Sequence, residues 1–480
     1  MKQRTSSSFY PDFMSGVGMI NAYSPLLLVV ILLITVTTGC QEKIDQVPGL
    51  YAITDVNVLP MDSESVYENH TVIVRDGRIE SVVPADQAVL PDGAHLIDGT
   101  GRYLMPGLAE MHGHIPGSDN PQYAEDVLFL YISNGVTTVR NMAGHPYHLE
   151  LRERLENNEL DGPTIFAATP WLSRNIIPEP DDAYEIVREF QEEGYDHMKM
   201  GSVPFDIYQA VAEASHETGL PFAGHIPEDV GLLSALEAGQ ASIDHLDRYV
   251  EFLAAEHPEA DERESGFFGS GMVDLVNEDR ISGAVEQTIE AGVWNVPTLT
   301  LVEHLATPES PEEMIEWPEM RYMPPDVLEG WVEAKHSFQA RDDFQPDAAQ
   351  RLVEIRLMLT RELYNGGAWI ALGSDAPQFF NVPGFSIHHE MEMMVTAGLT
   401  PFEVLETGTR NPAIYVEMPD EFGTIEEGRR ADLILLEDNP LQDIGNVRDQ
   451  AGVMVRGEWW PAERINERLD EIAQRMETGI

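Results

Sequence analysis

The chain has 480 residues, of which 43% are hydrophobic, and 29 Lys plus Arg against 83 Asp plus Glu give a formal net charge of −54. This hydrophobic content supports a substantial core and excludes global disorder, while the negative charge argues against a nucleic-acid partner, which needs a basic surface. The single cysteine excludes internal disulfides and thiolate-built metal sites.

The basic residues include only four lysines, Lys2, Lys43, Lys199 and Lys335. Acidic residues along the whole chain with almost no lysine are typical of a protein bathed in high salt, where screening removes self-repulsion. We therefore expect a halophilic acidic surface, with an ordinary acidic secreted protein as the alternative. A lysine inside an expected strand, such as Lys199, then needs its own explanation.

The N-terminal 39 residues have the pattern of a signal peptide. Lys2 and Arg4 precede a continuously apolar run from Leu26 to Ile34, which is too short to span a bilayer but suits a signal-peptide core. Because the run ends at Thr37-Thr38-Gly39-Cys40, the segment resembles a bacterial lipoprotein signal. We expect lipidation of Cys40 and a membrane-anchored location outside the cytoplasm, in the periplasm, at the outer membrane or on the cell surface. A plain secretory signal and an uncleaved anchor are the alternatives.

Two strand-rich pieces flank a longer central segment. After a short tether at 40–47, residues 48–104 read as short strands with turns, including Asp76-Gly77, a good hairpin signal. Residues 413–462 have the same character, and 463–480 read as an amphipathic helix. Since the two pieces lie at opposite ends of the central segment, we expect them to pair into one small composite β-sandwich domain.

Between residues 105 and 412, helical stretches repeatedly end in glycine just before a short apolar run. Glycine tolerates the left-handed conformation that closes a helix, and short, uniformly apolar runs are typical of buried parallel strands. The rhythm predicts an α/β fold, a (β/α)8 TIM barrel, with catalytic groups at the carboxyl ends of its strands. The expected strands are 108–112, 136–139, 163–168, 195–200, 220–225, 241–245, 293–297 and 368–373. The acidic, helix-like stretch at 300–350 is longer than a barrel needs, and we expect it to be a lid insertion.

Six residues of metal-ligand type end the predicted strands. In an extended backbone, residues i and i+2 point the same way, so the His-Gly-His of strand 1 can hold one ion. A lone histidine in an apolar strand is more often a core residue, as we expect for His197, and His388-His389 is expected to be structural. Six coincident strand-end placements instead indicate a metal site, formed by His112, His114, Lys199, His225, His245 and Asp375.

With these residues the chain resembles the amidohydrolase superfamily of metal-dependent hydrolases. It looks closest to the branch of imidazolonepropionase-like proteins and Xaa-Pro or Xaa-Arg dipeptidase-like enzymes. The resemblance covers residues 48–460, and its motifs occur in order: Met105-Pro106-Gly107-Leu108 before His112-Gly113-His114, Gly135 to Arg140, Ala223-Gly224-His225, Asp244-His245, Gly373-Ser374-Asp375, and Gly428 to Ile434.

The resemblance implies a role for each ligand. His112, His114 and Asp375 would hold the more buried of two divalent metal ions, and His225 and His245 the more exposed one. Lys199 would react with CO2 to give a carbamate that bridges both ions and neutralises part of their charge. Imidazole and carboxylate ligands suit Zn, with Mn, Fe or Co as alternatives.

The implied mechanism uses a hydroxide that bridges the metals to attack a carbonyl carbon. Asp375 would take its proton and pass it to the leaving amine. His145 and Tyr249 are candidates to stabilise the oxyanion, although Tyr249 suits packing equally well. Arg248 and Arg140 are candidates to hold a substrate carboxylate, with a salt bridge as the alternative for each.

Three functions follow. The first is a binuclear amidohydrolase that cleaves a C–N bond of a peptide or small molecule, such as an extracytoplasmic dipeptidase. The second is a mononuclear deaminase or cyclic-amide hydrolase, in which Glu228 serves as a proton shuttle; Lys199 counts against it. The third is a surface-anchored binding protein without catalysis, against which all six ligand types count. A homo-oligomer is also expected.

Overall fold

The structure is a computed structural model that describes residues 46–341 and 344–478. The expected signal segment, Cys40 and most of the tether lie outside these ranges. The described residues fall in one unit, Asp45–Ile480. Within them, none of the helices combines the length and the apolar character needed to cross a membrane.

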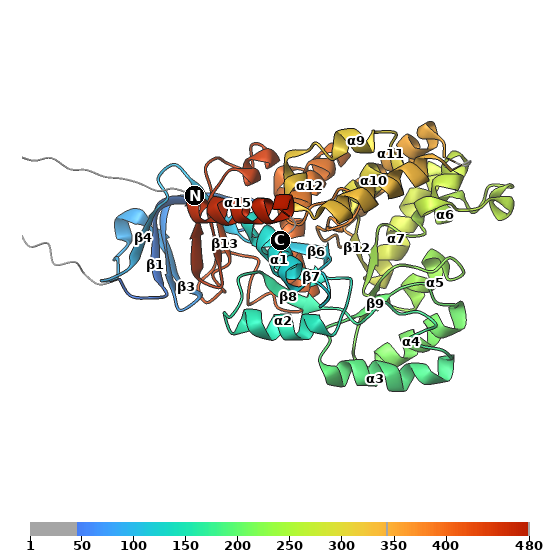
Figure 1. The fold of residues 1–480 in the computed structure, drawn as a ribbon, viewed down its shortest axis with the longest axis horizontal. Helices are drawn as coiled ribbons and strands as arrows, with labels where there is room; N and C mark the ends of the chain where they lie inside the picture. The colour runs from blue at the N-terminus through green and yellow to red at the C-terminus, as the bar shows by residue number, and fades with distance from the viewer. Residues whose placement is uncertain (1–45, 342–343, 479–480) are drawn as a thin grey trace, which may run out of the picture. The chain divides into compact units, whose positions relative to one another are not determined.

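One sheet is built from both flanking pieces, as predicted, and in Figure 1 its blue and red strands lie side by side. Its strand order is β15-β14-β13-β5-β1-β2-β3, and β4 pairs with β1. The joint is the antiparallel pair of β5 and β13, in which Leu433 lies opposite Pro106. The bounds are β1 Leu50–Val58, β2 Tyr67–Arg75, β3 Arg78–Pro84, β4 His95–Asp98, β5 Tyr103–Pro106, β13 Leu433–Leu436, β14 Gln450–Val455 and β15 Glu458–Pro461.

The composite sheet is held by its alternating apolar side chains. Val56, Val72, Leu104 and Leu433 are fully buried in one cluster, so strands from both chain ends share a core. The predicted hairpin joins β2 to β3, and Asp76 and Gly77 both have positive φ, 49° and 80°. That pair of angles is what a tight two-residue hairpin turn requires.

The central segment forms the predicted barrel. Two parallel sheets make up most of its wall, β6-β7-β8 and β12-β11-β10-β9. The strand bounds are β6 Leu108–Gly113, β7 Val136–Asn141, β8 Thr164–Ala167, β9 Met198–Met200, β10 Phe222–Gly224, β11 Ser242–Asp244 and β12 Trp294–Val296.

Backbone hydrogen bonds close the barrel between these two sheets. On one side, the Asp196 amide donates to the Ala167 carbonyl, which joins β8 to β9. On the other, residues 368–373 run as the eighth strand: the Ala371 amide donates to Asn295 on β12, and the Met111 amide on β6 donates to Leu372. The eight-stranded (β/α)8 architecture is therefore confirmed.

Helices follow the strands and cover the barrel (Figure 1). Glycines with left-handed φ end several of them, as predicted: Gly194 after α3, Gly219 after α4, Gly292 after α7 and Gly367 after α11. The helix bounds are α1 Pro121–Ser133, α2 Tyr147–Glu156, α3 Ala183–Glu193, α4 Phe205–Thr218, α5 Gly231–Glu237, α6 Tyr249–Ala254, α7 Ile281–Ala291, α8 Leu299–Ala306, α9 Pro311–Met314, α10 Pro325–Gln339, α11 Pro346–Gly366, α12 Phe385–Ala397, α13 Pro401–Gly408, α14 Arg410–Tyr415 and α15 Ala462–Thr478.

The extra segment at 300–350 is helical, consisting mainly of α8, α9 and α10, and its role as a lid stays a prediction. Lys335 on α10 is fully buried and its Nζ donates to the His304 carbonyl near the end of α8. The C-terminal α15 packs Ile465 and Leu469 into a core with Val453 of the composite sheet.

Candidate metal centre

The six candidate ligands come from the carboxyl ends of five barrel strands. His112 lies in β6 and His114 one residue beyond it; Lys199 lies in β9. His225 and His245 directly follow β10 and β11, and Asp375 follows the eighth strand. At two of these positions the chain leaves the extended conformation, with φ of 60° at His245 and 63° at Asp375. At these two positions the candidate ligand lies where the chain leaves its strand in the barrel wall.

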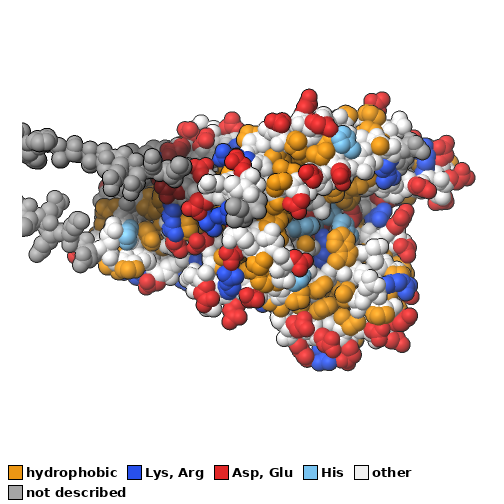
Figure 2. Space-filling model, in the orientation of Figure 1, with side chains coloured by type: hydrophobic (Ala, Val, Ile, Leu, Met, Phe, Trp, Pro, Cys, Tyr) orange, Lys and Arg blue, Asp and Glu red, His pale blue; other side chains and the backbone are white. Residues whose placement is uncertain are grey.

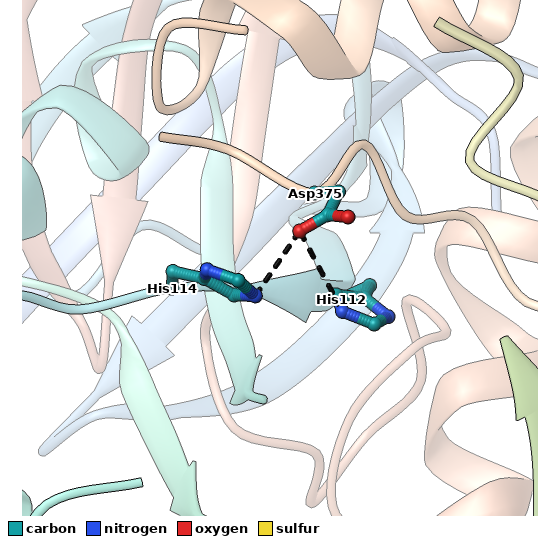
Figure 3. A group of neighbouring side chains, drawn as sticks. All are labelled: His112, His114 and Asp375. Carbon is teal, nitrogen blue, oxygen red and sulfur yellow. Dashed lines mark ion pairs between the residues drawn. The ribbon is translucent and has the colours of Figure 1, made fainter. Parts of the chain in front are cut away.

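His112, His114 and Asp375 form a compact group that could hold a metal ion (Figure 3). Oδ1 of Asp375 lies 3.0 Å from Nε2 of His114 and 3.6 Å from Nε2 of His112. Burial lowers the pKa of His114 to about 3 and raises that of Asp375 well above its usual range. Neutral imidazole is the form that binds a metal.

The donor atoms of this group fit a cation. Nε2 of His114 and Oδ1 of Asp375 are buried, and neither has a hydrogen-bond partner among the described residues. Two buried acceptor-capable atoms that face each other without a proton donor between them are costly unless something positive binds both. Histidine nitrogen and carboxylate oxygen also match the ligand preferences of zinc.

Lys199 extends into the same group. Its Nζ lies 3.2 Å from Nε2 of His112, and burial lowers its pKa. The side chain passes over Gly224 so closely that a Cβ there would lie 2.9 Å from Cδ of Lys199. Gly224, with φ of 111°, thus leaves the space that the lysine occupies.

His225 and His245 stand together beside this group, with ring centroids 4.6 Å apart. Each has a partner on Nδ1: Asp247 lies 2.9 Å from His225, and the Thr298 hydroxyl lies 2.8 Å from His245. Because the partner on Nδ1 fixes the ring, Nε2 of each is left to face a ligand. We did not anticipate Asp247 and Thr298 from the sequence; the only signal was the place of Asp247 two residues after His245.

Arg140 does not lie where a substrate carboxylate could reach it. It is fully buried inside the barrel, where Nη2 donates to both oxygens of Asp244, at 3.0 and 2.9 Å. Oδ2 of Asp244 lies 2.8 Å from Nδ1 of His112, although the ring is not turned for an in-line hydrogen bond. Burial alone would raise the pKa of Asp244, but Arg140 lowers it. The salt-bridge alternative therefore applies to Arg140, which neutralises the carboxylate beside His112.

The hydroxyl of Tyr249 makes its contacts away from the candidate ligands. The side chain is fully buried, and the hydroxyl lies 2.7 Å from Thr288 Oγ1 and 3.0 Å from Asn295 Oδ1. These contacts suit the packing alternative. His145 lies on the loop between β7 and α2, where its Nδ1 accepts from the Tyr147 amide and its ring lies beside Gly117. Its role at the oxyanion stays a prediction.

A cavity of about 390 Å³ opens beside His225. Figure 2 shows histidine side chains among hydrophobic ones near the middle of the face in view, with acidic side chains around them. Arg248 and Glu228 also line the cavity. Arg248 is paired with Glu251 at 2.7 Å, so its charge is already matched.

Known proteins resemble the chain over most of its length. A sequence model of the amidohydrolase family matches residues 103–460. Ochratoxinase from Aspergillus niger is 23% identical over 378 residues, which are 71% of each chain. A solved Xaa-Pro dipeptidase with bound methionine in its active site has a TM-score of 0.62 at 20% identity, covering 86% of this chain and 100% of the other. The match to a 5-methylthioadenosine/S-adenosylhomocysteine deaminase from Symbiobacterium thermophilum is 42% identical but spans only 15% of this chain and 17% of that protein.

Proposed function

Because the chain belongs to the amidohydrolase family and is therefore a hydrolase of carbon–nitrogen bonds, we propose that it is a binuclear metal-dependent amidase, a dipeptidase or related peptidase. The observation that carries the proposal is the convergence of the candidate ligands at one end of the barrel. Nζ of Lys199 lies against His112, which in turn lies against the His245 ring at a centroid distance of 4.5 Å. One group of side chains thus connects both proposed metal subsites.

His112, His114 and Asp375 would hold one ion and His225 and His245 the other, with Lys199 between them. Bound divalent ions would supply an activated water molecule and polarise the carbonyl of the scissile amide. Burial lowers the pKa of Lys199, which favours the neutral amine that attacks CO2. That reaction would form an N–C bond and release a proton, leaving a carbamate anion in place of the neutral amine.

Asp375 is the proposed proton carrier. Its Oδ2 accepts from Nε2 of Gln378 at 3.2 Å, while Oδ1 has no hydrogen-bond donor in the described part of the chain. A carboxylate in this position can accept a proton from the attacking water and donate it to the leaving amine.

The test is the metal content of protein purified in high salt with bicarbonate. We expect two metal equivalents per chain in the wild type and fewer in Lys199→Ala, because the bridging ligand is lost. Lys335→Met is the matched control, since it removes the other buried lysine and should keep both ions. A screen of dipeptides then measures activity in the same three proteins.

The alternative is a mononuclear deaminase or cyclic-amide hydrolase with Glu228 as proton shuttle. It is favoured by the position of Glu228 at the cavity beside His225, where no ion pair or hydrogen bond within the described ranges engages its carboxylate. A single metal equivalent that does not respond to Lys199→Ala would contradict the binuclear proposal and support this one.

We also propose that the enzyme is anchored outside the cytoplasm by a lipid on Cys40. The support is the sequence alone, an apolar run followed by Thr37-Thr38-Gly39-Cys40. Incorporation of labelled palmitate in the producing cell should disappear in Cys40→Ser. Equal labelling of both proteins would contradict the anchor.

A further inference from the structure

The cavity beside His225 has two aromatic walls. Trp171 and Phe268 both line it, and Phe267 adjoins Phe268 at a ring distance of 4.5 Å. Trp171 is 47% exposed, an unusual exposure for the largest hydrophobic side chain. Both walls touch the metal centre, since Trp171 stacks on His225 and Phe268 lies on His245, with centroid distances of 5.2 and 5.3 Å.

The position of Trp171 is built into the backbone beneath it. A Cβ on Gly201 would lie 1.4 Å from Nε1 of the indole. No side chain other than hydrogen fits there, so the glycine leaves the space that the edge of the indole occupies. The plane of the indole is then tilted by only 28° from that of His225. An exposed aromatic ring held this firmly is available to stack on a ligand.

Phe268, in the lining of the cavity, has an unusual backbone conformation. Its φ of 48° is left-handed, a conformation that bulky residues rarely adopt. Such conformations persist only where surrounding contacts determine them, and they cluster at ligand-binding sites. Here the contacts are the Phe267 ring and the buried Arg356, whose Cζ lies 5.4 Å from the Phe268 ring centre.

Apart from the proposed metal ions, the charges that line the cavity favour a neutral or cationic group. Arg248 is the only lysine or arginine that lines it, and Arg248 is paired with Glu251. Asp247 is engaged by His225. This leaves the carboxylate of Glu228, which has no partner within the described residues, and a second anion beside it would be repelled. Aromatic faces together with an unpaired carboxylate are a favourable setting for a cation.

We propose that this cavity binds a planar aromatic group of the substrate, neutral or positively charged, against the exposed Trp171, with Phe267 and Phe268 completing its aromatic lining. The inference rests on the proposed function and narrows it to amides that carry such a group next to the scissile bond. An amide with an aliphatic or carboxylate-bearing group in that place would be a poor substrate.

The first test is binding, which needs no turnover. Benzamidine is planar, aromatic and cationic, while acetamidine carries the same charge without the ring. By titration calorimetry on the metal-loaded enzyme, we expect benzamidine to bind about tenfold or more tightly than acetamidine, because the ring stacks. Trp171→Ala should remove this difference, whereas Trp369→Ala, which removes an exposed tryptophan elsewhere, should keep it. Equal benzamidine affinity in wild type and Trp171→Ala would overturn the proposal.

The second test compares kcat/KM for Ala-Ala, Phe-Ala and Ala-Phe with the matching glutamate dipeptides. We expect one phenylalanine dipeptide to exceed Ala-Ala by about tenfold, and Trp171→Ala to abolish that preference. Glu228→Gln should weaken the discrimination against glutamate. A wild type that binds benzamidine but cleaves none of the dipeptides would count against the dipeptidase proposal alone. A preference for glutamate in the wild type would overturn the inference.

Discussion

Lys335 is a buried cation that the proposed chemistry does not use. Its side chain is fully buried, and its Nζ donates to the His304 carbonyl and to Sδ of Met314. Burial lowers its pKa to about 8. Charging this amine inside the protein therefore costs stability at neutral pH.

We predict that Lys335 makes a pH-dependent contribution to stability. Its folded pKa of about 8 lies below its unfolded value of 10.5, so the unfolded chain binds more protons between these values. The free energy of unfolding should then rise with pH from about 8 to 10.5, by up to about 3 kcal/mol. Urea unfolding of wild type and Lys335→Met at several pH values in constant salt measures it. The stability gained by the substitution should shrink as the pH rises; a difference independent of pH would contradict the prediction.

At the level of single residues, the sequence predicted the side chains that end strands. The candidate ligands converge because the carboxyl ends of parallel strands meet at one end of a barrel. The residues that support them were not predictable in the same way. Thr298 reaches His245 across 53 positions of sequence, and Arg140 reaches Asp244 across 104. Such pairs depend on how neighbouring strands are rotated, which no local pattern records.

The barrel strands are tied together internally by one arginine. From β7, Arg140 donates to the Met111 carbonyl on β6 and to Ser242 and Asp244 on β11. It thus crosses the interior of the barrel between strands that are not neighbours in its wall. Removing it would leave the carboxylate of Asp244 buried without its counter-charge.

We predict that Arg140→Met destabilises the barrel by about 3–5 kcal/mol, the usual effect of breaking a buried ion pair. Adding Asp244→Asn removes the unpaired charge, so the double variant should recover part of this loss. Denaturant unfolding of the two single variants and the double variant forms the required cycle. Additive losses in the cycle would show that the pair is not coupled and would contradict this account.

At the level of elements, the glycine-ended helices were predictable because the left-handed conformation is nearly specific to that residue. Strand lengths were not. The expected strands at 220–225 and 241–245 contain assigned strands of only three residues, Phe222–Gly224 and Ser242–Asp244. They end early because Gly224 and His245 take positive φ, so the ladder stops where the ligands turn inward. The apolar residues there favour longer strands, but the positive φ of Gly224 and His245 ends each strand earlier.

Across the whole molecule, the net charge of −54 is the dominant electrostatic property. Repulsion among so many acidic groups opposes the compact state, and salt screens it, since the screening length falls from about 10 Å at 0.1 M to about 3 Å at 1 M. The composite sheet was predictable from its two strand-rich pieces, but the joint between β5 and β13 was not, because pairing of strands more than 300 residues apart depends on the complete barrel.

We predict that the melting temperature rises steeply with sodium chloride between about 0.1 and 2 M, because screening relieves the acidic surface. Differential scanning calorimetry at constant pH measures the shift. Sucrose at equal osmolality is the control, since it stabilises by exclusion and leaves charges unscreened. The same shift in sucrose would contradict an electrostatic origin and with it the halophilic interpretation.

The pairing of β5 with β13 also constrains the order in which the chain can fold during synthesis. β5 ends at Pro106, two residues before the start of β6, the strand that contains His112. The strand that pairs with β5, β13, begins only at Leu433. Until the last tenth of the chain has been made, β5 therefore keeps an unpaired edge next to the first candidate ligands. Contacts this distant in sequence form late and slowly. We therefore expect the candidate metal centre to reach its final geometry only after β13 has been made.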